Sequence, residues 1–282
     1  MRITRFRLSP GETQLSDQLF RSGRDLPQAL SCAHRFASVE GRLRIAPSDQ
    51  SGEFGAGQAS IVDFRLLTDL LRRVRQDGFH LLDASDAEFG QLAEGLGQPV
   101  AARRGGSTRD RLVPRRSGEA PERSLSHQHG LNAFPFHTDA AHHRTPPKLI
   151  LMRGAENCES STPTLLMDFC SLRLVPSDVA ALKRESWIAR GGPGRTFYTT
   201  ILRSIDGQGV LRFDLGCMSP VSGTTSGGEE ILSRAVRTVG PVEVDWYPGR
   251  VLILDNRRML HARPIVPESE RKTRAIDRVM LI

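Results

Sequence analysis

The stretch FPFHTDAAHHRTPP, residues 134–147, holds the most specific pattern in this chain. His137 and Asp139 stand two residues apart in it, so on an extended strand their side chains leave the same face and can bind one ion. His261 offers a third ligand far along the chain, after the apolar run VLIL at 251–254 that is typical of a buried strand. Two histidines and one carboxylate are the ligand set of non-haem Fe(II) sites that keep open positions for cosubstrate and O2. The sequence therefore predicts an iron site at these three residues.

The residues that follow this motif resemble a known protein family. Pro146 and Pro147 come after the candidate carboxylate ligand, and the apolar run LILM at 149–152 comes next. This order is similar to that of the iron- and 2-oxoglutarate-dependent dioxygenases of the taurine dioxygenase and clavaminate synthase-like family. Thr164 then stands where the family places a threonine that contacts 2-oxoglutarate. Many members have two glycines and an acid before that threonine, whereas this chain has SSTP at 160–163, so the turn must differ here.

The end of the chain extends the resemblance, which runs from about residue 78 to residue 282. Arg274 follows His261 by 274 − 261 = 13 residues, close to the family's position for the arginine that pairs with 2-oxoglutarate. Arg278 completes the family's R-x-x-x-R ending. A basic edge strand that discourages aggregation is the alternative role for these arginines. We favour cosubstrate binding, because a buried dicarboxylate needs a planar, bidentate partner that keeps its proton.

The resemblance implies a fold, cofactors and a reaction. The fold is a distorted double-stranded β-helix, or jelly roll, with flanking helices, in the β-dominated α+β class. Iron(II) is the metal, 2-oxoglutarate and O2 are cosubstrates, and Thr164 and Arg274 bind 2-oxoglutarate. The default reaction hydroxylates an unactivated C–H bond of a small acidic or amino-acid-like substrate, including natural-product or carrier-bound intermediates, with release of succinate and CO2. Asp139 argues against halogenation, for which related enzymes have this carboxylate replaced.

Candidate substrate contacts are Arg278, His142, Asn132 and Arg212. His142 and its neighbour His143 face either substrate or solvent. Arg212 either binds a substrate carboxylate or pairs with Asp214.

A second H-x-H pair, His127 and His129, has no matching carboxylate, which favours ordinary surface histidines over a metal site.

Composition and charge narrow the function classes. The chain has 282 residues, 38% of them hydrophobic, and a formal net charge of +7 that suits acidic small molecules or nucleic acid. Seven arginines and three acids lie in residues 101–123 without the aromatic residues that stack on bases. We expect a cytoplasmic protein without a membrane partner, since the N-terminus lacks an apolar signal region and no apolar run is long enough to span a bilayer. The four scattered cysteines indicate reduced thiols.

Apolar periodicity predicts the order of elements. A helix over 61–77 ends at Gly78, a strand follows at 78–82, and Ser85 with Glu88 forms a capping box that opens a second helix. From Lys148 onward short apolar runs suit a β-sandwich or barrel, interrupted by helices after Pro176 and Ser226.

The chain is predicted to contain one oxygenase domain at 59–282 and an N-terminal extension at 1–58 that packs on it. Residues 101–130 lack apolar periodicity, which predicts a long mobile loop placed to act as a lid. Both a monomer and a homodimer fit the sequence.

Two other functions compete with this one. A nucleic-acid-directed oxygenase uses the same ligand types, but it predicts a much shorter gap than the 261 − 139 = 122 residues between carboxylate and distal histidine here. A catalytically inert jelly-roll binding protein has no need for a complete set of metal and cosubstrate residues. The sequence therefore favours an oxygenase of small molecules and disfavours nucleic acid as a partner.

Overall fold

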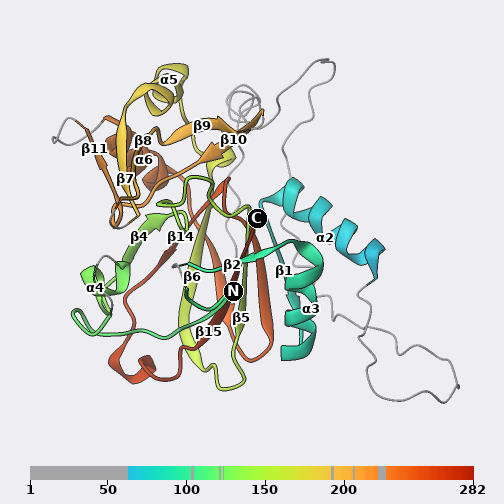
Figure 1. Ribbon diagram of the computed structural model, residues 1–282. Helices are drawn as coiled ribbons and strands as arrows, with labels where there is room; N and C mark the ends of the chain where they lie inside the picture. The colour runs from blue at the N-terminus through green and yellow to red at the C-terminus, as the bar shows by residue number, and fades with distance from the viewer. Residues whose placement is uncertain are drawn as a thin grey trace, which may run out of the picture.

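The computed structural model describes residues 63–282 apart from 103–104, 121, 123, 192–193, 206 and 222–226. Two antiparallel β-sheets of six and four strands form the centre of this part of the chain, and helices cover the outer face of the larger sheet (Figure 1). The fold is therefore mostly β with few helices, as the sequence predicts. The predicted extension at 1–58 lies outside the described residues.

The larger sheet contains the strands β1 (Phe79–Asp83), β2 (Pro99–Val100), β3 (Arg109–Leu112), β5 (Leu149–Gly154), β13 (Arg250–Asp255) and β15 (Ile276–Leu281). Its order is β1-β13-β5-β15-β2, and β3 pairs with the same edge of β15 as β2 does. The strands predicted at 78–82, 149–152 and 251–254 are confirmed in this sheet.

Two helices, α2 (Phe64–Asp77) and α3 (Asp86–Leu96), cover one face of the larger sheet. Helix α2 ends at Gly78, whose φ of 82° is the left-handed conformation that glycine adopts without strain. The predicted capping box of α3 is confirmed, because the side chains of Ser85 and Glu88 each accept a hydrogen bond from the other's backbone N–H.

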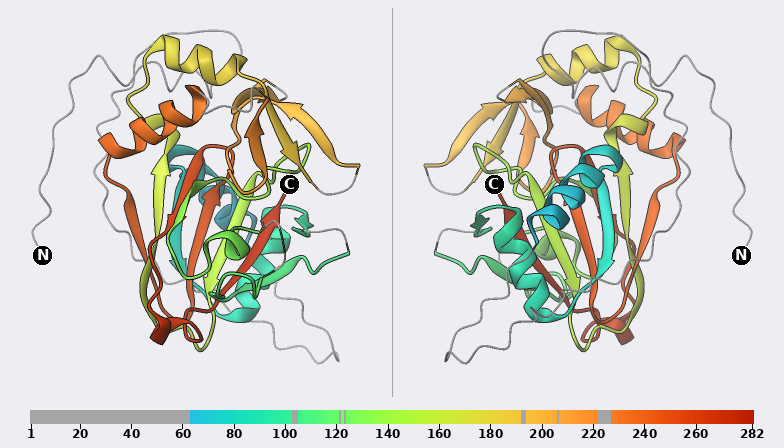
Figure 2. Two further views of the ribbon diagram at one scale, coloured as in Figure 1. Left: turned by 90° about the vertical axis from the view of Figure 1, so that its left-hand side faces the viewer. Right: turned by 90° about the vertical axis from the view of Figure 1, so that its right-hand side faces the viewer.

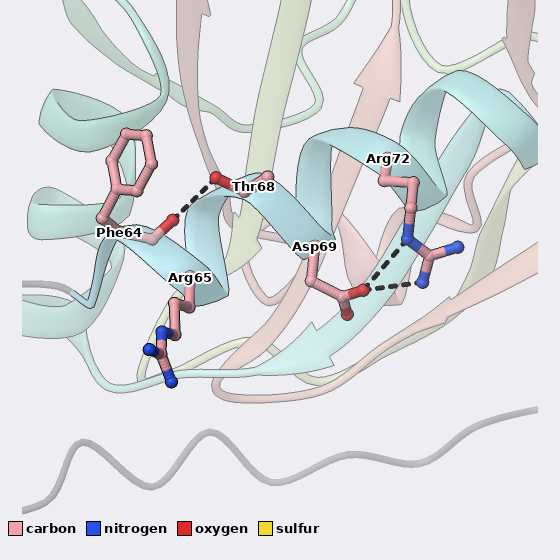
Figure 3. Close-up of a pocket in the computed structure, with 5 residues that line it drawn as sticks. All are labelled: Phe64, Arg65, Thr68, Asp69 and Arg72. Carbon is pink, nitrogen blue, oxygen red and sulfur yellow. Dashed lines mark hydrogen bonds and ion pairs between the residues drawn. The ribbon is translucent and has the colours of Figure 1, made fainter.

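The first turn of α2 lies at the surface. Phe64 is 80% exposed, and the buried side chains of this helix, Leu70 and Val74, belong to its later turns. A pocket beside it is lined by α2 alone, through Phe64, Arg65, Thr68, Asp69 and Arg72 (Figure 3). It is therefore separate from the strands that carry the candidate metal ligands.

Side chains of the central strands β5 and β13 point alternately to the two faces of the larger sheet. Leu151 and Ile253 pack against the helices, whereas Ile150 and Leu252 face the second sheet. All four are fully buried. Continuous apolar runs such as LILM are expected for strands that are buried on both faces.

The smaller main sheet contains β4 (Phe134–His137), β6 (Ser160–Asp168), β12 (Val242–Trp246) and β14 (Met259–Arg263), in the order β12-β6-β14-β4. Leu166, Val244 and Met259 from this sheet pack on the inner face of the larger sheet. The two sheets thus share one apolar core, and the strands with the candidate ligands form part of it.

A further region of short strands and two helices lies at one end of the two sheets (Figure 2). Trp187, Phe213 and Leu232 belong to its separate core. The predicted helix after Pro176 is confirmed, and so is the next one, although Ser226 before it lies outside the described residues. The elements are η1 (Phe169–Ser171), α5 (Pro176–Arg184), β7 (Trp187–Arg190), β8 (Thr196–Thr199), β9 (Leu202–Ile205), β10 (Gln208–Leu211), β11 (Met218–Pro220) and α6 (Gly227–Thr238).

The segment 101–130 is not one continuous loop, which corrects the prediction. It contains β3 and a short helix, α4 (Leu125–His129). Strand β3 forms without an apolar pattern because its charged residues pair with charges on β15: Arg109 and Arg111 bind Asp277, and Asp110 binds Arg278. Opposite charges across a strand pair stabilise it in place of apolar contacts.

Two other predictions concern the whole chain. Among the described residues, Cys158, Cys170 and Cys217 form no disulfide bond, and Cys32 lies outside the described residues. Within the described ranges, no helix is long and apolar enough to cross a lipid bilayer.

Candidate metal and cosubstrate site

The two candidate histidine ligands lie opposite each other on neighbouring strands. Strand β4 pairs with β14 so that His137 and His261 are direct cross-strand partners, and their ring centroids lie 4.3 Å apart. Directly opposite residues of an antiparallel pair point to the same face. The pairing of these two strands therefore brings together ligands that are 124 residues apart (261 − 137 = 124).

Asp139 lies just beyond the end of β4, in a turn rather than on the extended strand that the sequence predicts. The turn includes Ala140, whose φ is 52°. Asn256 holds this turn: its side-chain oxygen accepts from the Asp139 backbone N–H at 2.8 Å, and its amide donates to the Asp139 carbonyl at 3.0 Å. The fully buried Asn256 thus sets the direction of the carboxylate.

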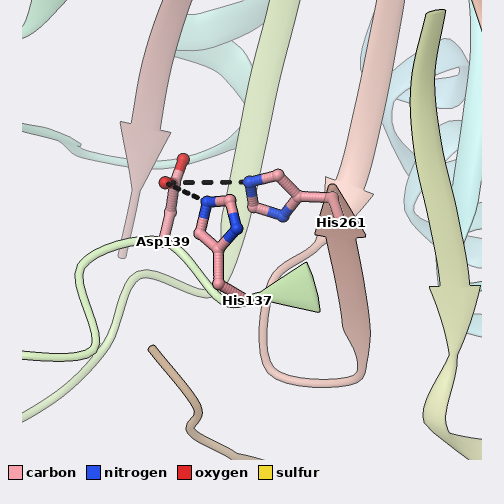
Figure 4. Close-up of side chains that lie close together, drawn as sticks. All are labelled: His137, Asp139 and His261. Atoms are coloured by element: carbon pink, nitrogen blue, oxygen red, sulfur yellow. Dashed lines mark ion pairs between the residues drawn. The ribbon is translucent and has the colours of Figure 1, made fainter. Parts of the chain in front are cut away.

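The three side chains converge on a common centre (Figure 4). Asp139 Oδ1 lies 3.9 Å from His137 Nε2 and 3.7 Å from His261 Nε2. One donor atom from each residue lies within 4.8 Å of the others, and all three residues are buried. Donors at right angles around a metal at about 2.1 Å would be about 3 Å apart, so each of the two carboxylate–imidazole distances would shorten by under about 1 Å on metal binding.

The surroundings of the imidazoles fit metal binding. His137 Nδ1 lies 2.9 Å from the Pro135 carbonyl, which keeps the proton on Nδ1 and leaves the Nε2 lone pair directed at the centre. Burial, together with the nearby His261, lowers the pKa of His137 to about 4. A neutral ring is the form that binds a metal.

The carboxylate ligand is held in its ionised form. Burial alone would raise the pKa of Asp139, but Arg278 and His261 lower it far below its ordinary value. Arg278 Nη1 donates to Asp139 Oδ2 at 2.9 Å, which leaves Oδ1 facing the histidines. The other terminal nitrogen of Arg278 donates to Asp110 Oδ2 on β3 at 3.1 Å.

Arg274 and Thr164, the candidate cosubstrate contacts, lie together in the same core. Arg274 Nη2 donates to Thr164 Oγ1 at 3.2 Å, and its Nε donates to the Thr162 carbonyl at 3.3 Å. The Trp246 indole donates to the same threonine oxygen at 2.9 Å. Thr164 and His261 lie on the neighbouring strands β6 and β14, and the pairing of His261 with Leu166 places both side chains on one face of the sheet.

The charge of Arg274 has no ion-pair partner among the described residues. Its side chain is buried, and burial lowers its pKa to about 10. A buried guanidinium is costly unless an anion binds it. Spare donors on a planar, buried cation suit the carboxylate of a small acid.

The sequence predicts a turn at 160–163 before Thr164, but in the structure these residues already belong to strand β6, which begins at Ser160. The side chains of Ser160, Ser161 and Thr162 all donate to the carboxylate of Glu270, which belongs to the short helix η2 (Glu268–Glu270). Burial alone would raise the pKa of Glu270, but these hydrogen bonds lower it to about 2. An acid from a distant segment thus stabilises the start of β6.

Arg212 has neither of the two roles that the sequence left open for it. It is fully buried and donates to the backbone carbonyls of Ala141, His143 and Arg144. No ion pair joins it to Asp214 among the residues that the structure describes. Arg212 therefore stabilises the turn that follows Asp139, because three backbone carbonyl groups of this turn accept hydrogen bonds from its guanidinium.

The other candidate substrate contacts are placed differently. Arg278 lies beside the candidate metal ligands, where it donates to Asp139 and Asp110. His142 and His143 are half-buried, and one ring nitrogen of each lies 3.4 Å from the Ala102 carbonyl. Asn132 is exposed and contributes its backbone carbonyl to Arg263.

The second histidine pair does not form a metal site. His127 and His129 lie on α4, and His127 Nδ1 contacts the Ala120 carbonyl at 3.0 Å. Of the residues described, only His137, Asp139 and His261 form a group able to hold a metal.

Four residues around the site were missed by the sequence analysis. Asn256 holds Asp139, Glu270 holds the start of β6, and Asp110 holds Arg278. Arg263 stacks on the Phe134 ring and donates to the Gly130 and Asn132 carbonyls before β4. Only Asp110 could have been found from the sequence, because the charges alternate in RDR at 109–111 and in DR at 277–278. Without the strand register, these charges could not be paired.

No family model matches the chain, and no curated protein matches it in sequence. Solved structures do match. Asparagine oxygenase in complex with Fe(II), 2S,3S-3-hydroxyasparagine and succinate aligns with a TM-score of 0.62 at 20% identity, over 77% of this chain and 79% of that one. The non-haem iron oxygenase OrfP in complex with Fe and alpha-ketoglutaric acid aligns with a TM-score of 0.60 at 17% identity, over 78% and 80%. This chain therefore has the fold of these iron oxygenases.

Proposed function

We propose that this chain is an Fe(II)- and 2-oxoglutarate-dependent oxygenase. One observation carries the proposal: two imidazole Nε2 atoms and one carboxylate oxygen converge in the buried core, in a chain with the fold of iron oxygenases. A ligand set of two histidines and one carboxylate is typical of non-haem Fe(II). The double-stranded β-helix is the topology that we infer for the two packed sheets.

Each residue has a distinct role in this proposal. His137, His261 and Asp139 Oδ1 hold the metal, and Arg274 with Thr164 binds the distal carboxylate of 2-oxoglutarate. When bound, iron with 2-oxoglutarate and O2 supplies an oxidant for a C–H bond, with release of succinate and CO2. Asn256 and Arg278 orient the carboxylate ligand, and the apolar residues of the two sheets exclude water.

The substrate that we propose is a small acidic or amino-acid-like molecule, free or carrier-bound. Two matching structures support this class: asparagine oxygenase is described with 3-hydroxyasparagine, and OrfP with (3S)-hydroxy-L-Arg. Hydroxylation is the expected outcome. His142 and Asn132 remain candidate substrate contacts.

The segment 101–130 is proposed to act as a lid or wall of the site within a single domain at 59–282. Its strand β3 is anchored on β15, and Asp110 reaches the arginine that binds a candidate metal ligand. Gly105 and Gly118 have φ of 71° and 84° and are suitable hinges around β3.

Two measurements, made one after the other, test the proposal. Anaerobic addition of Fe(II) and then 2-oxoglutarate to the purified chain should produce a visible charge-transfer absorption band at one equivalent of iron. A panel of asparagine, arginine, homoarginine, other amino acids, taurine and carrier-bound amino acids should then reveal a substrate that triggers succinate release. Absence of the band with correctly folded protein would refute the cofactor assignment.

A further inference from the structure

A chain of three charged side chains connects β3 to the candidate metal site. Asp110 accepts from Arg278, and Arg278 donates in turn to Asp139 Oδ2, at 3.1 and 2.9 Å. The exposed fraction of the side chain falls along the chain, from 34% for Asp110 to 15% for Arg278 and 9% for Asp139. The segment that the sequence presents as a loop thus reaches a ligand in the core.

The strand register explains why only Asp110 takes part. Arg278 is the direct cross-strand partner of Asp110, and Asp277 is that of Arg111. Alternate residues point to opposite faces, so Asp110 and Arg278 face the space between the two sheets. Arg111, with Arg109, binds Asp277 on the other face, toward the helices. Strand β3 therefore takes part in two separate groups of charges. Asp110 and Arg278 form the inner pair, between the two sheets, and Arg109 and Arg111 bind Asp277 on the helix side.

The inner pair affects the electrostatics of the site. The three charged groups sum to −1 + 1 − 1 = −1, counting Asp110, Arg278 and Asp139. Without Asp110 the sum would be zero, and the Arg278 cation would be balanced by the metal ligand alone. A divalent cation would then face a more positive site, with its carboxylate ligand more strongly engaged by arginine.

We propose that Asp110 is a positioning residue for the metal site, acting through Arg278 on Asp139. With Asp110 present, the Arg278 guanidinium binds two carboxylates, those of Asp110 and Asp139. Asp110 holds the guanidinium in the orientation that leaves Asp139 Oδ1 free. Its negative charge also favours the binding of a cation at the site. The inference rests on the proposed function, since it assumes that the three convergent ligands bind a divalent metal. The competing explanation is that Asp110 only fastens β3 to its neighbour, a role that Arg111 shares.

The test compares two variants of the same strand in the full chain. Co(II), an air-stable probe with visible absorption, is titrated into the wild-type chain, Asp110→Asn and Arg111→Gln. Loss of an outer-shell partner of a metal ligand typically weakens affinity by roughly 10- to 100-fold, and we expect that loss for Asp110→Asn. Arg111→Gln should bind within about twofold of wild type, because Arg109 still binds Asp277. Asp110→Ser is a second neutral variant, expected to show the same loss if Asp110→Asn does not fold.

A double-mutant cycle identifies the route of the effect. In an Arg278→Met background, Asp110→Asn should weaken Co(II) binding by a much smaller factor than it does in wild type. Three results would each overturn the inference while leaving the proposed function in place. The first is that Asp110→Asn weakens Co(II) binding by the same factor in both backgrounds. The others are that Asp110→Asn and Asp110→Ser bind Co(II) as tightly as wild type, or that Asp110→Asn and Arg111→Gln lose the same affinity. Absence of Co(II) binding by the wild-type chain would overturn both.

Discussion

His261 is the ligand whose loss should be easiest to interpret. Its Nε2 faces Asp139, whereas its buried Nδ1 has no hydrogen-bond partner among the residues that the structure describes. Within that part of the chain, replacing His261 therefore removes the proposed metal ligand without breaking a hydrogen bond of Nδ1. Replacing His137 would be harder to interpret, because its Nδ1 also hydrogen-bonds the Pro135 carbonyl.

We expect His261→Ala to abolish binding of one Fe(II) or Co(II) per chain. Removing a direct ligand should cost more than the roughly 10- to 100-fold caused by loss of an outer-shell partner. Metal content after desalting and a Co(II) titration measure the effect. His129→Ala, from the other H-x-H pair, is the control and should retain one equivalent. Full metal retention by His261→Ala would move the site elsewhere.

Arg274→Ala should weaken 2-oxoglutarate binding. Removing one partner of a buried charge-assisted pair costs roughly 3 to 5 kcal/mol, which corresponds to about two to four decades in Kd. Anaerobic titration of the iron form, followed by the charge-transfer band, gives the affinity. Arg271→Ala is the matched control, because Arg271 already pairs with Glu119 and Glu268. Unchanged affinity in Arg274→Ala would transfer the anchor to another arginine, with Arg278 or Arg271 next.

Helix η2 stabilises the start of β6 through one carboxylate. Glu270 accepts hydrogen bonds from three hydroxyl groups and from the Thr162 backbone N–H. Thr162 in turn accepts from Arg274. The Glu270 carboxylate therefore connects η2, through the first residues of β6, to the proposed cosubstrate anchor Arg274.

Glu270→Gln should remove part of the acid dependence of stability. The pKa of Glu270 is lowered to about 2 in the folded chain, so its contribution is present above its unfolded pKa and is lost as pH falls toward 2. Chemical denaturation of wild type and variant between pH 7 and pH 3 should give a stability difference that shrinks toward acid. Glu268→Gln is the control, since its carboxylate is itself exposed and pairs with Arg116 and Arg271. A constant difference across this range would contradict this role of Glu270.

The two parts of segment 101–130 should differ in their sensitivity to trypsin. Arg109 and Arg111 are paired within the sheet, whereas Arg115 and Arg116 are exposed between β3 and α4. We expect the first cleavage after Arg115 or Arg116, and protection there once iron, 2-oxoglutarate and substrate are bound together. Peptide mass mapping locates the cuts. Protection by DNA at physiological salt, without protection by small ligands, would instead support a nucleic-acid-directed oxygenase.

A helix layer and two main sheets form the centre of the described part of the chain, and the candidate site lies on only one side of the larger sheet. Leu92 of α3 is fully buried against the outer face of that sheet, and the two candidate histidine ligands lie on strands of the other sheet. Stability and metal binding can therefore be changed separately.

Leu92→Ala should destabilise the fold by about 2 to 5 kcal/mol, the usual cost of a buried leucine truncation. Urea unfolding measures the loss, and Glu94→Ala, an exposed position on the same helix, should be nearly neutral. Because α3 lies on the opposite face from the site, the folded variant should still bind one metal per chain. Loss of metal stoichiometry in the folded variant would contradict this separation.

Local sequence patterns predict the candidate ligands His137 and Asp139 and most of the elements. His137 and Asp139 are close in sequence, and the apolar runs around 149–152 and 251–254 predict buried strands because their residues pack on both faces. Capping at Ser85 and the helix end at Gly78 are equally local. Thr164 and Arg274 were identified by resemblance, and the structure places them in contact.

The environment of those ligands depended on pairings across large sequence separations. Asp110 and Arg278 are 168 residues apart, and Glu270 and Ser160 are 110 residues apart. A charged residue in a single sequence has many possible partners, and a shift of one residue in strand register turns it to the opposite face. The folded chain therefore buried Arg212 against the turn after Asp139, made 109–112 a strand, and directed Asp110 toward the site while Arg111 points away.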